Sequence, residues 1–273
     1  MVTVGYIGNL MQVAEYLFHE KDLSVAGVIC EAGKLSDDLL TFSAVRNIPL
    51  YEVGGPEDLI NAAGRIQADF FVMCAFGIKI PQEMIEKMDT YNIHPSSLPD
   101  YRGRHPTFWA TVRDEKSMGI TLHKVAAKID AGEIITQRSC PYYLWMTEQD
   151  MFDELIKKVP ELLGDLQAYL KGMLESRSNS GGSYFKPVLE SDFTINIDKD
   201  SPAEMVNKVR AQKRFKGAKL QLDGKTLWLK KVRLTRPQPV QLTRGKSYES
   251  GDGLLCVSYN EYLSLKLIEY AEE

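Results

Sequence analysis

The sequence predicts an α/β core built on a mostly parallel sheet, followed by a smaller β-rich domain. In the first part of the chain, short apolar segments alternate with amphipathic helical segments. The most apolar segment, residues 69–76 (DFFVMCAF), is continuous rather than alternating, as in strands that are buried on both faces. After residues 176–183 (SRSNSGGS), short alternating strands replace this pattern. We therefore expect a core over residues 1–178 and a second domain over residues 184–273.

The elements of the core follow from apolar periodicity and from helix start and stop signals. Strands are expected at 2–7, 24–30, 49–53, 69–76 and 90–94, with helices at 9–20, 36–45, 56–67 and 81–88. A helix at 106–115 and strands near 119–125 and 134–139 continue the layer. A long helix begins at Thr147, with Asp150 at the capping-box position, and Pro160 is expected to kink it.

The second domain is expected to be mainly β. Residues 176–183 are rich in serine and glycine and predict a flexible linker. Strands are expected at 192–197, 218–223, 226–235, 253–258 and 262–268, with one helix at about 201–213. Asp223-Gly224 between two strands is a tight hairpin signal.

Composition excludes several classes of protein. Of 273 residues, 44% are apolar, which is enough for a packed core, and no apolar run approaches the length of a membrane span. The N-terminus, MVTVGYIGN, has no charged leader or cleavage site, so we expect no export signal. The four cysteines are scattered, which favours reduced, buried thiols in a cytoplasmic protein.

Charge is unevenly distributed along the chain. The net charge is −4, but residues 201–250 hold 13 Lys and Arg against three acids, hence +10, so the other residues sum to −14. A basic segment on an acidic protein suggests a partner that carries phosphate. The alternative is a solvated surface, and the sequence leaves both open.

The first candidate site is the stretch YNIHPSSLPDYRGRHP, residues 91–106, which follows a predicted parallel strand. Open α/β sheets bind ligands at this end of their strands. Asn92 and His94 stand two residues apart, so both side chains project from one face. A carboxamide suits an oxyanion that develops during acyl transfer, and an imidazole exchanges protons near neutral pH. A purely structural histidine is the alternative.

The second candidate site is GITLHKVAAKIDAGEI, residues 119–134. Asp130 precedes Ala-Gly, where glycine permits a tight turn. A carboxylate near His94 would fix its tautomer and favour the imidazolium. An ordinary turn aspartate is the alternative. Other motifs are weak, because the chain has no GxGxxG spacing, no GxSxG elbow, and no His spaced with Cys or Asp as a zinc site.

Together the two stretches resemble the folate-dependent formyltransferase family. The resemblance is carried by Asn92-Ile-His94, Ser96-Ser-Leu-Pro99, Tyr101-Arg-Gly103, Pro106, Gly119 to His123 and Ile129-Asp-Ala-Gly132. Residues 74–81 (CAFGIKIP) are similar to the family's folate-side strand and loop, and residues 210–218 (RAQKRFKGA) are loosely similar to a stretch after its linker. The resemblance implies a Rossmann-like core and a second domain similar to an oligonucleotide-binding (OB) barrel.

The resemblance also implies roles for particular residues. Asn92, His94 and Asp130 would be catalytic. The folate, 10-formyltetrahydrofolate, would be bound by Phe76, Gly77, Ile78, Ile80, Val125, Lys128 and Ile129. The acceptor would be bound by Lys79, Ser96, Tyr101, Arg102, Gly103, His105 and Trp109. His105 replaces what is often a small residue, so it either contacts the acceptor or caps its helix. No metal is expected.

Several acceptors are compatible with the resemblance. Members that act on methionyl-tRNA resemble a longer chain with a basic insertion after the second strand, whereas here residues 31–38 are short and net acidic. That segment and Trp109 are more similar to the sugar N-formyltransferases. We therefore expect a nucleotide-linked amino sugar as acceptor, a role in making cell-surface polysaccharide such as lipopolysaccharide O-antigen, and a cytoplasmic homodimer without nucleic-acid or membrane partners. Methionyl-tRNA or another small amine is the alternative, and a catalytically dead binding module or a deformylating hydrolase also stays open.

The expected mechanism follows from the residue types. The amine must be neutral to attack the formyl carbon, and neutral His94 would take its proton. Asn92 would donate a hydrogen bond to the oxyanion, and Asp130 would orient His94 and stabilise its charged form.

Overall fold

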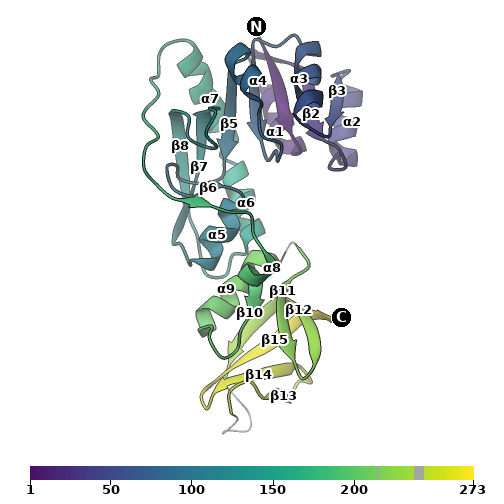
Figure 1. Cartoon of the computed structure of the whole chain (residues 1–273), viewed down its shortest axis with the longest axis vertical. Helices are drawn as coiled ribbons and strands as arrows, with labels where there is room; N and C mark the ends of the chain where they lie inside the picture. Colours follow the sequence, from purple (N-terminus) through teal and green to yellow (C-terminus); the bar gives the residue numbers. More distant parts are fainter. Residues whose placement is uncertain (214, 237–242) are drawn as a thin grey trace. The chain divides into compact units, whose positions relative to one another are not determined.

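The computed structural model describes residues 1–213, 215–236 and 243–273 (Figure 1). Arg214, which belongs to the loosely similar stretch 210–218 and to the basic segment, lies outside the described residues, as do residues 237–242. The described residues form two main sheets of seven and six strands and a small two-stranded one.

The larger sheet has the strand order β3-β2-β1-β4-β5-β7-β8. Its strands are β1 Val2–Gly8, β2 Leu23–Glu31, β3 Leu50–Val53, β4 Phe70–Cys74, β5 Thr90–His94, β7 Ser117–Lys124 and β8 Ile134–Pro141. The first five are mutually parallel, and β7 then pairs antiparallel with β5. This mostly parallel α/β core confirms the predicted fold class. Strand order departs in both directions from β1, and open α/β sheets bind ligands outside the carboxyl ends of their strands at such a switch point.

Helices connect the strands of the larger sheet or follow them along the chain. They are α1 Met11–His19, α2 Asp37–Val45, α3 Pro56–Arg65, α4 Gln82–Lys87, α5 Pro106–Val112, α6 Glu148–Ile156 and α7 Val159–Leu170. Ser36 caps α2 by accepting a hydrogen bond from Leu39 N. The helix expected from Thr147 begins with the predicted Thr147–Asp150 capping box, but it is two helices. Pro160 lies in the first turn of α7, where its missing N–H costs nothing, and so it starts a helix instead of kinking one.

The core of the larger sheet is formed by the continuous apolar strands. Ile7, Ile29 and Phe71, from three neighbouring strands, are buried in one cluster with Leu59 and Ala63 of α3. Burial of such side chains contributes roughly 1.5–3 kcal/mol each. A rigid sheet of this kind holds the loops at its carboxyl edge in place.

The smaller sheet is the C-terminal one, with the order β10-β11-β12-β15-β14-β13. Its strands are β10 Thr194–Ile195, β11 Ala218–Leu222, β12 Lys225–Thr235, β13 Ser247–Glu249, β14 Leu255–Asn260 and β15 Leu263–Glu272, and the helices α8 Glu190–Phe193 and α9 Pro202–Gln212 accompany them. Asp223 and Gly224, both with positive φ, form the predicted hairpin between β11 and β12. The β-rich character of this region agrees with the prediction.

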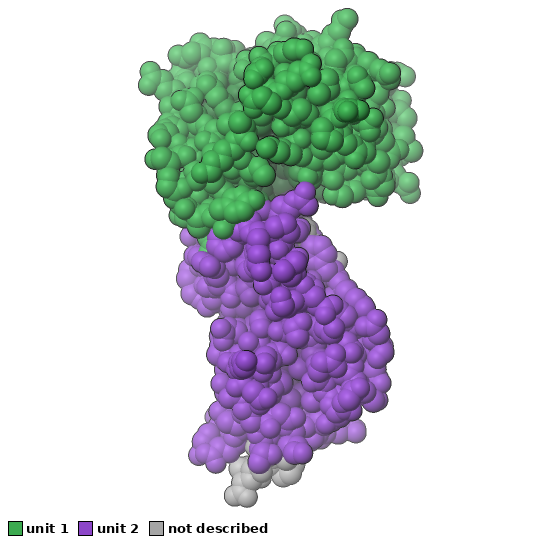
Figure 2. Space-filling view, in the orientation of Figure 1, with its two compact units in different colours: residues 1–103, 119–140, 154–184 green, residues 104–118, 141–153, 185–273 purple. Residues whose placement is uncertain are grey.

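The chain divides into two compact units, coloured in Figure 2. Unit 1 comprises residues 1–103, 119–140 and 154–184, and unit 2 comprises residues 104–118, 141–153 and 185–273. The expected division near residues 178–184 therefore coincides with only the last crossing between the units. Two earlier segments of the chain, residues 104–118 and 141–153, also belong to unit 2 with the C-terminal residues.

The segment expected to be a flexible linker, residues 176–183, belongs to unit 1 and is hydrogen-bonded to other residues of that unit. Arg177 and Ile134 exchange both backbone hydrogen bonds, at 2.8 and 2.9 Å. Further along, the two-residue strand β9, Tyr184–Phe185, belongs to a two-stranded sheet with β6, Arg102–Gly103. Because these bonds fix its backbone, the segment does not behave as the free coil that its serine and glycine content suggested.

Candidate active site

Asn92 and His94 lie on the last residues of β5, at the carboxyl edge of the larger sheet. Both side chains are buried, with 7% and 5% of their surface exposed. Alternation along the strand places them on one face, as predicted. The antiparallel pairing of β5 with β7 sets His123 directly opposite Asn92 and Thr121 opposite His94.

Asp130 lies in the turn between β7 and β8, with a φ of +50°, a backbone conformation that is uncommon for residues other than glycine. This turn requires glycine at position 132. The reason is steric, and not the backbone freedom expected from the sequence. A Cβ at Gly132 would lie 1.9 Å from the Lys124 carbonyl oxygen, so only glycine fits. The Gly103 N–H donates to Asp130 Oδ2 at 2.9 Å and holds the carboxylate.

The structure brings these three side chains together, since Asp130 Oδ2 lies 3.7 Å from His94 Nδ1. Asn92 Nδ2 donates to Asp130 Oδ1 at 3.3 Å. The carboxylate thus faces the imidazole with one oxygen and the carboxamide with the other. Positive φ values at Ala75, Tyr101 and Asp130 show that several turns of unit 1 around the carboxyl edge are conformationally strained.

The His94 ring is oriented by a backbone group. Its Nε2 lies 2.9 Å from the Tyr101 carbonyl oxygen, which can only accept, so Nε2 carries the hydrogen of the neutral ring. The 3.7 Å between His94 Nδ1 and Asp130 Oδ2 is too long for a hydrogen bond. The tautomer is therefore fixed by Tyr101 and not, as expected, by Asp130. The lone pair lies on Nδ1, toward the carboxylate.

Protonation states follow from burial and from these neighbours. Burial lowers the pKa of His94 below its ordinary value of 6.5, although the Asp130 carboxylate acts in the opposite direction. Burial alone would raise the pKa of Asp130, but the His94 and His123 rings and the Gly103 N–H outweigh it and lower that pKa to about 2. The site therefore pairs a neutral imidazole with an ionised carboxylate at neutral pH.

His123 is a member of the site that no sequence pattern had assigned a role. It is 1% exposed, and its Nε2 lies 3.1 Å from Asn92 Nδ2 and 3.6 Å from Asp130 Oδ1. Its Nδ1 lies 2.7 Å from the Lys124 carbonyl oxygen and must donate to it, and Asn92 Nδ2 can only donate, so Nε2 is the acceptor for Asn92. The signal that could have found it was the antiparallel register of two strands.

The predicted folate residues divide into a buried and an exposed set. Ile80 belongs to the cluster of the larger sheet, and Phe76, Ile78 and Val125 pack against that cluster while partly exposed. A half-exposed apolar surface beside a loop backbone fits a flat heteroaromatic ring. Gly77 is held by its N–H, which donates to Glu31 Oε1 at 2.8 Å. Lys128 and Ile129 are exposed on the turn before Asp130.

The predicted acceptor residues of unit 1 differ in availability. Lys79 is exposed, whereas Ser96 is fully buried and donates to the Asp100 carbonyl oxygen at 2.8 Å. Tyr101 and Gly103 use backbone groups on His94 and Asp130. Arg102 is 6% exposed and donates to the carbonyl oxygens of Asp130, Gly181 and Asn179 and to Asn179 Oδ1. Its guanidinium is thus engaged inside the protein.

His105 and Trp109 belong to unit 2. His105 occupies the N-cap position of α5 with a φ of +57°, but its side chain makes no capping hydrogen bond. Its Nδ1 accepts instead from the Val188 N–H, at 3.5 Å. The Trp109 indole stacks on Phe185 and donates to the Lys186 carbonyl oxygen at 3.1 Å.

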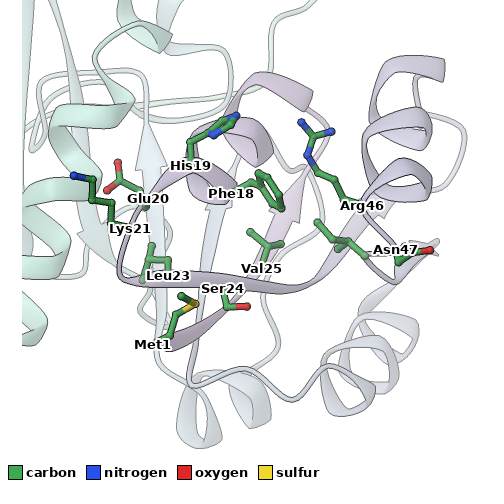
Figure 3. A pocket seen from close by; sticks show the side chains of 11 residues that line it. Met1, Phe18, His19, Glu20, Lys21, Leu23, Ser24, Val25, Arg46 and Asn47 are labelled. Carbon is green, nitrogen blue, oxygen red and sulfur yellow. The ribbon is translucent and has the colours of Figure 1, made fainter.

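A separate hollow of about 490 Å³ lies at the amino-terminal ends of β1 and β2, away from the predicted site residues (Figure 3). Phe18, His19, Lys21 and Arg46 are among its lining residues. Within residues 1–213, 215–236 and 243–273, no group of three or more His, Cys, Asp or Glu side chains is placed to hold a metal ion. No helix in the same ranges is long and apolar enough to cross a membrane.

The fold and the site define an α/β enzyme that carries an amide, an imidazole and a carboxylate at the carboxyl edge of its sheet, an arrangement suited to group transfer with proton exchange. The formyl transferase family model matches residues 51–165, which include all three side chains. This match, together with similar structures solved with tetrahydrofolic acid or 5-N-formyl-THF, supports a folate-dependent formyltransferase that uses 10-formyltetrahydrofolate as the formyl donor.

Similar sequences carry methionyl-tRNA formyltransferase names. The protein of Malacoplasma penetrans is 28% identical over 81% of this chain and 74% of its own. That of Geobacter sulfurreducens is 31% identical over 66% of this chain and 58% of its own. The chain therefore spans little more than half of the Geobacter relative.

Similar solved structures carry other names. The N-formyltransferase of Helicobacter canadensis, solved with folinic acid and dTDP-3-aminofucose, has a TM-score of 0.70 at 19% identity, over 98% of this chain and 99% of its own. HypX of Aquifex aeolicus, solved with tetrahydrofolic acid, has a TM-score of 0.71 at 18% identity, over 97% of this chain and 43% of its own. At this identity the likeness establishes the shared fold.

Proposed function

We propose that this chain transfers the formyl group of 10-formyltetrahydrofolate to the amino group of a nucleotide-linked amino sugar. The observation that carries the proposal is that Asp130, in the turn between β7 and β8, lies within 3.7 Å of both Asn92 and His94 of β5. Each of the three supplies a function that amine formylation needs.

His94 is the general base of the proposed mechanism. The amine of the acceptor approaches Nδ1, because Nε2 is occupied by the Tyr101 carbonyl oxygen. A proton taken up at Nδ1 faces the Asp130 carboxylate, which is ionised at all but strongly acidic pH, since its pKa is about 2. Asp130 therefore stabilises the imidazolium by charge rather than by orienting the neutral ring.

Asn92 is the hydrogen-bond donor to the formyl oxygen. Both hydrogens of its Nδ2 are directed at protein acceptors, His123 at 3.1 Å and Asp130 at 3.3 Å. To donate to the developing oxyanion, Asn92 must exchange one of these contacts. The contact with Asp130 is the longer and is the one that we expect to be released. Removal of one such donor costs about 10²–10³-fold in kcat.

The donor is bound along residues 76–80 and the turn before Asp130. Phe76, Ile78 and Val125 offer partly exposed apolar surface, and the neighbouring loop backbone offers polar groups to the edge of the pterin. Glu31 supports this loop, because its Oε1 accepts from both Gly77 N and Asn9 Nδ2 at 2.8 Å.

The acceptor class rests on features of both units. The connection from β2 to α2 is short, and Glu31 at its start is tied to Asn9 and Gly77, so it offers no basic arm for RNA. In the basic segment, many cations have internal partners: Lys208 pairs with Asp200, Lys216 with Glu273, Lys219 with Glu190 and Lys225 with Glu272. Two similar structures are also named sugar N-formyltransferases.

Methionyl-tRNA is the second candidate acceptor, because the curated relatives carry that name. Purified protein should be incubated with 10-formyltetrahydrofolate and, in turn, a panel of nucleotide-linked amino sugars and methionyl initiator tRNA, with products read by mass spectrometry and His94→Asn as the inactive control. Formylation of a sugar nucleotide supports the proposal, and formylation of the tRNA alone supports the second candidate. A salt-steep complex with initiator tRNA in a gel-shift assay would also favour RNA.

The proposal includes a cytoplasmic homodimer that serves cell-surface polysaccharide synthesis. Light scattering of the purified protein tests the oligomeric state. Deletion of the gene followed by analysis of the surface polysaccharide for N-formyl sugars tests the biological role.

A further inference from the structure

We propose that Arg102 and Asn179 are positioning residues that hold the Asp130 turn, and that Asn179 does so from within residues 177–184, which overlap the segment expected to be a free linker. We call residues 177–184 the strap. All of them, with Arg102 and Asp130, belong to unit 1. The inference deepens the proposed function, because it concerns the placement of the carboxylate that serves His94.

The contacts begin with Asn179, whose side chain lies beneath the turn and is 8% exposed. Its Nδ2 donates to the Asp130 carbonyl oxygen at 3.0 Å and to the Gly132 carbonyl oxygen at 2.8 Å. These two bonds use both hydrogens of the amide. They span the turn on either side of Ala131, so they fix its backbone.

Arg102 is hydrogen-bonded to the same turn. Its Nε donates to the Asp130 carbonyl oxygen at 3.0 Å, and its Nη2 donates to Asn179 O at 2.6 Å and Asn179 Oδ1 at 2.8 Å. The Oδ1 contact orients the amide so that its Nδ2 faces the turn. Arg102 and Asn179 are therefore bonded to each other, and each donates one hydrogen bond to the Asp130 carbonyl oxygen.

The strap itself is anchored along its length. Arg102 Nη1 donates to the Gly181 carbonyl oxygen at 2.6 Å, and Ser183 accepts from Tyr101 N and Arg102 N at 3.0 Å. A Cβ at Gly182 would lie 2.0 Å from the Pro99 carbonyl oxygen, so the strap approaches the 96–103 loop as closely as glycine allows. The residue that orients His94, Tyr101, is thus bonded to the same segment.

The consequence concerns the carboxylate of Asp130. Its φ of +50° is sparsely populated and persists only where neighbours enforce it. Without the two Asn179 bonds, the turn can relax, and Asp130 Oδ2 moves from its place 3.7 Å from His94 Nδ1. A misplacement of about 1 Å in a catalytic constellation can cost about 10²-fold in rate.

The experiment compares Asn179→Ala, Asn179→Asp and Ser180→Ala in the full chain. Ser180 is the matched control, because its exposed side chain lies in the strap next to Asn179. The first readout is kcat for formyl transfer together with the Kd for the folate. The second is the pKa of His94 from NMR titration of the free protein, which requires no substrate.

We expect kcat of Asn179→Ala to fall at least tenfold (about 10²-fold at most) with unchanged folate Kd, whereas Ser180→Ala matches the wild type. The pKa of His94 in Asn179→Ala should fall, because the carboxylate that raises it has moved. Asn179→Asp keeps an oxygen for Arg102 but loses both donors to the turn, so its kcat should fall as well. If Asn179→Ala does not fold, Asn179→Asp carries the test.

Wild-type kcat in Asn179→Asp would overturn the inference, because Asn179 would then serve only to bind Arg102. An unchanged His94 pKa and kcat in a folded Asn179→Ala would overturn it too. If the wild-type protein formylated none of the acceptors, the proposed function would fail, but the NMR titration would still decide whether the strap places Asp130.

Discussion

Asn92 Nδ2 lies 3.1 Å from His123 Nε2, and the two residues are directly paired across β5 and β7. His123 Nδ1 donates to the Lys124 carbonyl oxygen, so the ring presents a lone pair to the Asn92 amide. The amide nitrogen, rather than the amide oxygen, is thereby turned toward His123 and Asp130. This relationship decides that the Asn92 amide group presents its donor, Nδ2, to the site.

Replacement of His123 should therefore impair Asn92. In His123→Leu, the amide loses its acceptor and becomes free to turn over, so we expect kcat to fall by about tenfold or more, toward the 10²–10³-fold effect of losing an oxyanion donor outright. His123→Gln keeps an acceptor on a flexible side chain and should retain more activity. Steady-state kinetics and the folate Kd test this prediction. The loss should appear in kcat and not in the folate Kd.

The matched control for this prediction is His19→Leu, a histidine that lies in the same unit and is exposed. Equal activity of His123→Leu and His123→Gln would contradict the role given to the acceptor. A loss confined to thermal stability would mean that His123 only packs against its neighbours.

Much of the fold was predictable because its signals are local. Continuous apolar segments and amphipathic segments predicted the order of strands and helices, and Asp223-Gly224 predicted a hairpin. These predictions succeeded because each pattern depends only on residues that are close in the sequence. Pro160 was misjudged because a helix interior and a helix start share one apolar pattern. The division into units was only partly predictable, because the segments 104–118 and 141–153 are defined by tertiary contacts.

The sequence predicted which residues form the site better than it predicted how those residues contact and orient one another. Asn92, His94 and Asp130 were singled out by residue type and strand position, and the structure brings them together. Sequence spacing could not show that Tyr101 orients His94, because that contact depends on the path of the 96–103 loop. Asn179 escaped notice because a serine- and glycine-rich segment is usually free, whereas here tertiary hydrogen bonds hold it.

Phe76→Ala should weaken folate binding more than acceptor binding. Phe76 packs against the apolar cluster beside the loop proposed for the pterin, and alanine removes that surface. Calorimetric Kd values for the folate and for a sugar nucleotide measure the difference. The control is Phe18→Ala, a 40% exposed aromatic ring at the opposite edge of the sheet. Equal weakening of both ligands would contradict the assignment of this loop.

Gly132→Ala should destabilise the protein and lower its activity. The added Cβ would lie 1.9 Å from the Lys124 carbonyl oxygen, so the Asp130 turn must shift. Overpacking of this kind costs about 1–3 kcal/mol in the free energy of unfolding. Gly164→Ala is the control, because this glycine lies within α7 with no atom near its Cβ position, and alanine should stabilise the helix by about 0.5–1 kcal/mol. Urea unfolding and kcat check both; a Gly132→Ala variant as stable and active as wild type would show that the turn is not constrained.

The pH dependence of kcat/KM should report the His94–Asp130 pair. The pKa of His94 is lowered from 6.5 by burial, so the neutral base is lost only as the pH falls below 6.5. Asp130, with a pKa of about 2, stays ionised over this range. In Asp130→Asn, the charge that raises the His94 pKa is gone, so the acid limb should move to still lower pH while the maximal rate falls. The part of the pH profile that reports deprotonation of the acceptor amine should be the same for wild type and Asp130→Asn. A shift of the acid limb to higher pH in Asp130→Asn would show that Asp130 does not raise the pKa of His94.

The His94 and Asp130 variants should be strongly non-additive. His94→Asn keeps a polar side chain but removes the group that takes the proton at Nδ1. Asp130→Asn keeps the size of the side chain but removes the charge 3.7 Å from that atom. Each single change should lower kcat by at least about 10²-fold, as expected for positioned acid–base groups.

The double variant should be hardly worse than the worse single variant, because without the imidazole the carboxylate has no imidazolium to stabilise. Folate and acceptor Kd values should stay close to those of the wild type, since neither residue is proposed to anchor a ligand. The cycle requires kcat and both Kd values for four proteins. Multiplicative effects of the two changes would show that Asp130 acts independently of His94. Near-normal kcat in His94→Asn would show that another group takes the proton.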